Sequence, residues 1–191
     1  MTRTFVAVFP PEEVRREVAR RLAPHARDTS VKWVPHDLMH FTLRFFGDLD
    51  EDRLERVTEL TGQVALLASP FVARLSGAGT FPPKGRPRVF WVGLGAGAPA
   101  LRELAEMLDR AFAGAGLGAS DRPMSPHLTV GRAKQMRGRK GAHAEKRPDF
   151  RRLTFDTLEF KVRSVSVVAS QLSPRGPAYT PLAEFLLSGE G

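Results

Sequence analysis

Two short segments of this chain combine a histidine with a threonine inside an apolar alternation. His40 precedes Thr42, and His127 precedes Thr129, with apolar residues between and after them. In a β-strand, successive side chains point to opposite faces, so each histidine shares a face with the threonine two positions later. The two side chains are then about 6.6 Å apart along the strand. Each segment therefore predicts a strand with one polar, potentially reactive face.

The residue types of these segments suit one kind of chemistry. Imidazole changes its charge near neutral pH, so one histidine across a cleft can accept a proton while the other donates one. Threonine hydroxyls can donate hydrogen bonds to the oxygens of an anion. An acid, a base and anion donors together favour displacement at phosphorus. A single segment of this type arises often by chance, whereas two of them are a stronger indication.

Two arginines extend these segments. If the alternation continues, Arg44 shares the face of His40 and Thr42, whereas Phe45 points into the core. Arg132 follows the second segment. Both guanidinium groups are candidates for neutralising a bound phosphate, and surface ion pairing is the alternative explanation.

Two other patterns favour a structural interpretation. His36 and His40 have the i, i+4 spacing of a helical metal half-site, but Pro35 and the strand-like alternation argue against a helix there. The Gly93-x-Gly95-x-Gly97 run has its third glycine misplaced for a dinucleotide-binding turn, so a tight strand-to-helix connection explains it better. We expect no metal and no cofactor.

Composition excludes several classes of protein. The 191 residues include no cysteine, so disulfides, thiolate metal sites and a cysteine nucleophile are impossible. An apolar fraction of 42% with 26% charged residues is typical of a globular chain. Neither a run of about 18 apolar residues nor a signal peptide is visible. We therefore expect a cytoplasmic protein without membrane contact.

The positive charge is concentrated in one segment. The chain carries a formal net charge of +8, and residues 132–152 contain nine basic but only two acidic residues. Such a segment attracts polyanions, nucleic acid first, although a solvated loop is the plain alternative. The charge also favours a monomer.

Apolar spacing predicts the elements that position these residues. Helices are expected over 12–27, 54–67 and after Pro99, and strands over 3–9, 39–46, 71–75, 88–94, 127–132, 153–160, 162–170 and 180–187. This mixture indicates an α+β fold with antiparallel sheet. A strand and a helix precede each histidine segment, so we expect two similar lobes that face each other.

At the level of these segments the chain resembles the 2H phosphoesterases, and most closely the RNA 2′,3′-cyclic phosphodiesterases long called 2′–5′ RNA ligases. The resemblance covers nearly the whole length and rests on Arg3–Val8, Lys32–Pro35, His40–Gly47, Phe81–Pro83, Arg86–Gly93, Pro126–Arg132 and Gly176–Thr180. One departure is Phe41, since the family often has an aliphatic residue there.

The resemblance implies a fold and an activity. The fold would be one domain, residues 1–191, of two intertwined pseudo-symmetric lobes, each an antiparallel sheet backed by helices, around a V-shaped cleft. The activity would be hydrolysis of RNA 2′,3′-cyclic phosphate ends to 2′-phosphomonoesters. His40 would protonate the leaving 3′ oxygen, His127 would deprotonate the attacking water, and Thr42 and Thr129 would hold the phosphate oxygens. Ligation to a 2′–5′ linkage and a non-catalytic RNA-binding module are the alternatives.

Overall fold

The structure is a computed structural model that describes residues 1–26, 29–134, 153–174 and 176–190. Its strands are β1 (Thr2–Val8), β2 (Val31–Trp33), β3 (Phe41–Leu49), β4 (Phe71–Phe81), β5 (Val89–Leu94), β6 (His127–Ala133), β7 (Glu159–Val162), β8 (Ser164–Ser173) and β9 (Gly176–Leu186). Its helices are α1 (Glu12–Leu22), α2 (Glu51–Leu67) and α3 (Ala98–Gly114), with short 3-10 turns η1 (Ala23–His25) and η2 (His36–Leu38).

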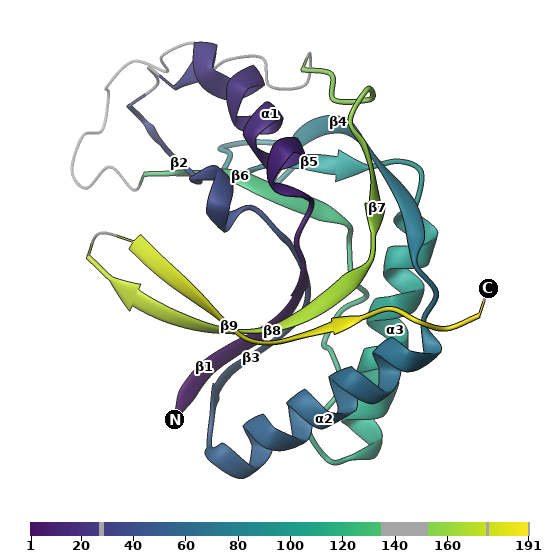
Figure 1. Cartoon of the computed structure of the whole chain (residues 1–191). Coiled ribbons are helices and arrows are strands. Elements are labelled where there is room, and N and C mark those ends of the chain that lie inside the picture. Colours follow the sequence, from purple (N-terminus) through teal and green to yellow (C-terminus); the bar gives the residue numbers. More distant parts are fainter. Residues whose placement is uncertain (27–28, 135–152, 175, 191) are drawn as a thin grey trace.

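The strands form two antiparallel sheets. In the described part of the chain, a four-stranded sheet has the order β3-β1-β8-β9, and a five-stranded sheet has the order β2-β6-β5-β4-β7. The four-stranded sheet lies below the five-stranded one in Figure 1, with the β8–β9 hairpin under β2. This arrangement confirms the predicted α+β class with two antiparallel sheets.

Each sheet contains the same strand–helix–strand unit. In the four-stranded sheet β1 leads through α1, and then through β2 of the other sheet, to its antiparallel neighbour β3. In the five-stranded sheet β5 leads through α3 to its antiparallel neighbour β6. The second strand of each unit carries one histidine–threonine segment. The internal repeat predicted from the order of elements is therefore present, and it places the two segments in different sheets.

Segments distant in the sequence are exchanged between the sheets. Strand β2, from the first third of the chain, pairs with β6 in the five-stranded sheet, whereas the C-terminal strands β8 and β9 complete the sheet that begins with β1. Neither sheet can form from one continuous half of the chain. A single domain over residues 1–191 stays a prediction, which this exchange supports.

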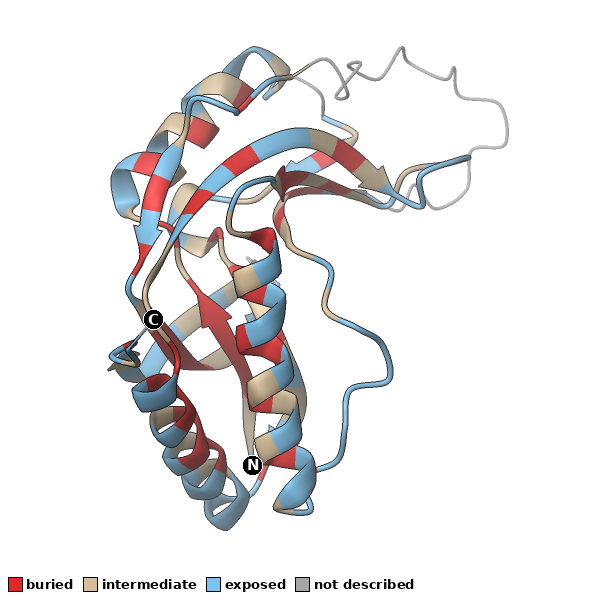
Figure 2. Ribbon diagram, turned by 90° about the vertical axis from the view of Figure 1, so that its right-hand side faces the viewer, coloured by how far each residue is buried: buried red, intermediate tan, exposed pale blue. Residues whose placement is uncertain are grey.

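Helices α2 and α3 lie side by side and pack on the four-stranded sheet (Figure 1). Asp50 caps the start of α2, where its carboxylate accepts a hydrogen bond of 2.9 Å from the backbone N–H of Arg53. Each helix buries one stripe of side chains, which Figure 2 shows as red bands, because its apolar residues recur at helical spacing. The core between helices and sheets includes Val57, Leu108 and Phe112.

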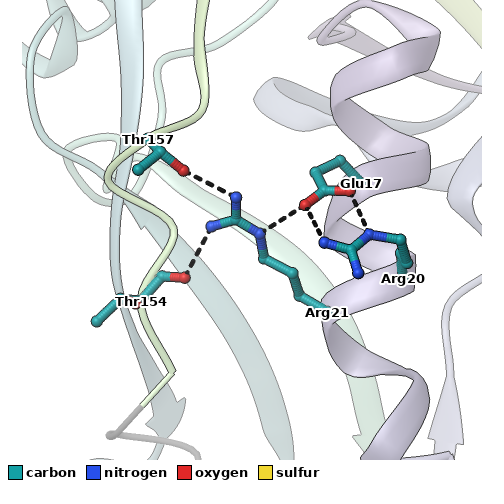
Figure 3. A network of polar contacts seen from close by, with 5 residues as sticks. All are labelled: Glu17, Arg20, Arg21, Thr154 and Thr157. Atoms are coloured by element: carbon teal, nitrogen blue, oxygen red, sulfur yellow. Dashed lines mark hydrogen bonds and ion pairs between the residues drawn. The ribbon is translucent and has the colours of Figure 1, made fainter.

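Helix α1 is joined to the segment that precedes β7 (Figure 3). Arg21 donates to the backbone carbonyl of Thr154 at 3.1 Å and to the hydroxyl of Thr157 at 2.8 Å. Glu17 accepts from both Arg20 and Arg21, and these hydrogen bonds lower the pKa of its carboxyl to about 2. The network fixes the end of α1 against a segment more than a hundred residues away.

The predicted elements differ from the observed ones most clearly in four places. The helix expected over 12–27 ends at Leu22 and continues as η1, where Pro24 interrupts the α-helix. The strand expected over 71–75 continues to Phe81 because Gly79 leaves room for the Trp91 ring, which a Cβ would overlap. Residues 153–158 are not strand, and the short β2 was not predicted.

Two further expectations concern loops. The turn at Gly97 begins α3 with φ +83°, and a Cβ there would collide with the backbone of β4, so the glycine run serves a tight strand-to-helix connection. Most of the basic segment, residues 135–152, lies outside the described residues. No helix in the described ranges is long and apolar enough to cross a membrane.

Candidate functional site

A pocket of about 290 Å³ opens between the two sheets. Its wall combines residues from the start of β3, from β6, from β2 and from the β8–β9 hairpin. They are Phe5, Lys32, Trp33, Val34, Pro35, Leu38, His40, Thr42, Phe45, Thr129, Arg132, Ser170, Pro177 and Tyr179. The pocket thus gathers three of the four residues of the histidine–threonine segments, and no residue of its wall is acidic.

The two histidines are held in the same way. Nδ1 of His40 lies 2.8 Å from the carbonyl oxygen of Leu38, and Nδ1 of His127 lies 2.7 Å from that of Ser125. A carbonyl oxygen can only accept, so Nδ1 carries the proton in both rings. In its neutral form, each imidazole therefore presents Nε2 as its proton acceptor. In both segments the carbonyl belongs to the residue two positions before the histidine.

His40 is enclosed by aromatic rings. It stacks on Phe5 with ring centroids 4.8 Å apart, and Phe9 and Tyr179 lie at 5.4 and 5.3 Å. This burial lowers the pKa of His40 to about 4, and the positive charges of Arg132 and His127 act in the same direction, against the hydrogen bond to Leu38. Before an anion binds, His40 is therefore neutral at pH 7.

His127 does not line the pocket, but it lies beside it. It begins β6 two positions before Thr129, and its charge acts on the pKa of His40. Its ring meets the Phe81 ring edge-on, with centroids 5.2 Å apart, and Phe81 in turn packs on Trp91. The structure thus brings both histidines and both threonines to one place.

Each histidine strand contains a β-bulge directly after its threonine. In β3, Thr42 pairs with Ala7 and Arg44 with Val6, which leaves Leu43 as the extra residue. In β6, Thr129 pairs with Trp91 and Gly131 with Phe90, which leaves Val130 as the extra residue. A bulge shifts the alternation by one position. The residue that shares the threonine's face is consequently the third one after it, Phe45 in β3 and Arg132 in β6.

The bulge corrects the prediction for Arg44 and Phe45. Phe45 is 49% exposed and lines the pocket rather than the core. Arg44 points to the opposite side, where its guanidinium donates to Asp109 at 2.7 Å and to Ser120 at 2.5 Å. Among the described residues, Arg44 therefore forms a structural ion pair with Asp109 that joins β3 to α3. Ion pairing was the alternative left open from the sequence.

Arg132 reaches the pocket because of the bulge at Val130, since strict alternation would have placed it on the inward face with Leu128 and Val130. Its side chain is exposed and lines the pocket, and its positive charge lowers the pKa of His40. Burial raises the pKa of Tyr179, and the charge of Arg132 opposes this shift. Arg132 thus stands near both rings, with its charge available to an anion.

Comparison with known proteins identifies the family to which the chain belongs. The family model described as the 2′-5′ RNA ligase superfamily matches residues 10–173. The chain belongs to this superfamily. A protein of Thermus thermophilus named RNA 2′,3′-cyclic phosphodiesterase is 37% identical, with 98% of this chain and 91% of the relative covered. One of the same name from Methanothermobacter thermautotrophicus is 34% identical, with 97% and 98% covered.

The fold of this 2′-5′ RNA ligase superfamily member is also found among solved structures. The crystal structure of TT0787 of Thermus thermophilus superposes with a TM-score of 0.82 at 34% identity, covering 99% of this chain and all of that one. The expected 2H phosphoesterase architecture is therefore confirmed.

Sequence reasoning missed part of this superfamily site. Phe5 and Tyr179 pack on His40, and Lys32 lines the pocket, yet none was proposed as a site residue. The alternation of β1 places Phe5 and Ala7 on one face. Only the pairing of β1 with β3, in which Ala7 lies opposite Thr42, shows that this face adjoins the site. In the described part of the chain, no three His, Asp or Glu side chains gather to hold a metal ion.

Proposed function

We propose that this protein hydrolyses the 2′,3′-cyclic phosphate at the end of an RNA chain to a 2′-phosphomonoester. The observation that carries the proposal is the meeting of His40 and Thr42 from one sheet with Thr129 and Arg132 from the other around a pocket without acidic residues. Such a pocket favours an anion, and its paired hydroxyls and imidazoles suit a reacting phosphate. The named relatives support the same activity.

The reaction requires one proton to be taken up and one to be released. Nε2 of His127 takes a proton from water as its oxygen attacks phosphorus, and the bond from phosphorus to the 3′ oxygen breaks. His40 donates a proton to that 3′ oxygen. Thr42 and Thr129 donate hydrogen bonds to the non-bridging oxygens, and Arg132 balances their negative charge.

The acid role of His40 depends on the substrate. Before substrate binds, its pKa of about 4 leaves this imidazole without a proton to donate at pH 7. A phosphate held beside it by Thr42 brings a negative charge that raises this pKa, because an opposite charge favours the protonated imidazole. Binding of the cyclic phosphate therefore favours the protonated form of His40, which is the form that acts as the acid.

An RNA oligonucleotide ending in a 2′,3′-cyclic phosphate, incubated with the protein in EDTA, tests the proposal. The expected product is a 2′-phosphate end, and His40→Ala and His127→Ala should each lower kcat by at least about 10³-fold, as for loss of an acid or base catalyst. A cyclic end that persists, or a 3′-phosphate product, would contradict it.

Two alternatives have less support. Ligation to a 5′-hydroxyl would need that group to displace water, which is far more concentrated. A module that only binds RNA would not need two imidazoles that each present Nε2 beside one pocket. A monomeric state and a cytoplasmic location stay predictions.

A further inference from the structure

Two cations stand directly opposite each other in the five-stranded sheet. Lys32 of β2 is the cross-strand partner of Arg132 of β6, and both side chains line the pocket. The Cβ atoms of such partners are about 5 Å apart, and like charges in this position destabilise a sheet. The pair therefore needs an explanation outside the stability of the sheet.

No acidic partner compensates this pair. The wall of the pocket contains no Asp or Glu, and neither Lys32 nor Arg132 forms an ion pair with any residue that the structure describes. Elsewhere in the described chain, arginines such as Arg44 and Arg74 are matched with carboxylates. Both cations are exposed and are thus available to an anion from solution.

The two cations occupy different depths of the site. Arg132 acts on the pKa of His40 and of Tyr179, so it lies near the reacting centre. The Lys32 ammonium instead reaches toward the β8–β9 hairpin, where a Cβ on Gly176 would stand 3.4 Å from Nζ. Lys32 therefore spans from the five-stranded sheet to the tip of the four-stranded one, and positive charge continues outward from Arg132.

A pocket of about 290 Å³ is at the lower limit for ligand pockets and suits about one nucleotide. The RNA that precedes the terminal nucleotide must then leave the pocket past its rim. We propose that Lys32 binds the phosphodiester that joins the terminal nucleotide to the rest of the RNA, which makes the site selective for RNA ends over free cyclic mononucleotides. This inference rests on the proposed function.

A substitution that removes the charge but keeps most of the side chain tests the proposal. Lys32→Gln is compared on two substrates, a dinucleotide that ends in a 2′,3′-cyclic phosphate and 2′,3′-cyclic AMP, which lacks the preceding phosphodiester. The KM for the dinucleotide should rise about tenfold, the usual effect of losing one charged contact, with kcat unchanged. For 2′,3′-cyclic AMP both constants should stay within about twofold.

Lys161→Gln is the matched control. Lys161 is also an exposed lysine of an edge strand, β7, at the opposite edge of the same sheet. It should leave the KM for both substrates unchanged. Lys32→Gln removes one of the two positive charges that face each other on Lys32 and Arg132. The Tm of the Lys32→Gln variant should therefore equal or exceed that of the unsubstituted protein.

A substrate whose internucleotide linkage is uncharged, but which keeps its cyclic phosphate, completes the test. A dinucleotide whose phosphodiester is replaced by a methylphosphonate should bind the unsubstituted protein about tenfold more weakly, and Lys32→Gln should then cause no further loss. Equal effects of Lys32→Gln on both substrates, or none, would overturn the inference while leaving the proposed function intact. Failure of the unsubstituted protein to hydrolyse either substrate would instead overturn the proposed function.

Discussion

The aromatic enclosure of His40 predicts a specific loss of stability in acid. The pKa of this imidazole is about 4 in the folded protein, against an ordinary value of 6.5 that applies to the unfolded chain. Between these values the unfolded chain binds a proton that the folded protein excludes. The contribution of His40 to stability is therefore intact above about pH 6.5, decreases as the pH falls toward 4, and is constant below.

The size of the effect follows from proton linkage. Going from pH 7 to pH 5, a single group whose pKa is lowered from 6.5 to about 4 reduces the free energy of unfolding by about 2 kcal/mol. The full loss below pH 4 is about 3 kcal/mol. These values are a large part of the 5–15 kcal/mol that stabilise a typical domain, so the loss is measurable.

Urea unfolding at pH 7 and pH 5, followed by the fluorescence of Trp33 and Trp91, measures this free energy. His40→Asn removes the titrating Nε2 and keeps an N–H donor near the carbonyl of Leu38. Its stability should fall by about 2 kcal/mol less than that of the unsubstituted protein over the same pH interval. His25→Asn, outside the aromatic enclosure, is the control and should keep the original pH dependence. Parallel losses in the unsubstituted protein and His40→Asn would refute the reasoning.

Other changes test neighbouring parts of the structure. Thr42→Val should lower kcat about 10²-fold with a KM within a few-fold, because the hydroxyl is proposed to stabilise charge in the transition state; an unchanged kcat in steady-state assays would exclude that role. Arg44→Ala should lower the free energy of unfolding by about 2 kcal/mol in urea titrations, since it removes the ion-pair partner of Asp109 and leaves this carboxylate with the backbone N–H of Ser120, while kcat/KM stays within about threefold. Gly79→Ala should destabilise the protein by about 1–3 kcal/mol and shift the fluorescence of Trp91, whose ring occupies the space of the new Cβ.

Residue periodicity was enough to predict that four polar side chains share the pocket-facing sides of two strands. His40, Thr42, His127 and Thr129 alternate with buried residues, and such alternation is a local property of the sequence. The same local patterns predict the individual strands and helices, and the order of these elements predicts the antiparallel class and the internal repeat.

What the sequence did not reveal depends on pairing between strands. A bulge is set by the register of two strands, so the exchange of Arg44 for Phe45 on the pocket face cannot be read from either strand alone. Strand β2 has three residues, too few to form a recognisable period. The rings around His40 come from residues 5, 9 and 179, which only the completed fold brings together.

The placement of β8 and β9 has a consequence for biosynthesis. The chain emerges from the ribosome N-terminus first, so β1 and β3 are made long before residues 164–186 can join them. Until then β1 has one unpaired edge, which is a template for association with other chains, and His40 lacks the Tyr179 ring. A chain cut short by premature termination would be aggregation-prone and would lack one wall of its pocket, so a cell would gain activity only from fully translated copies.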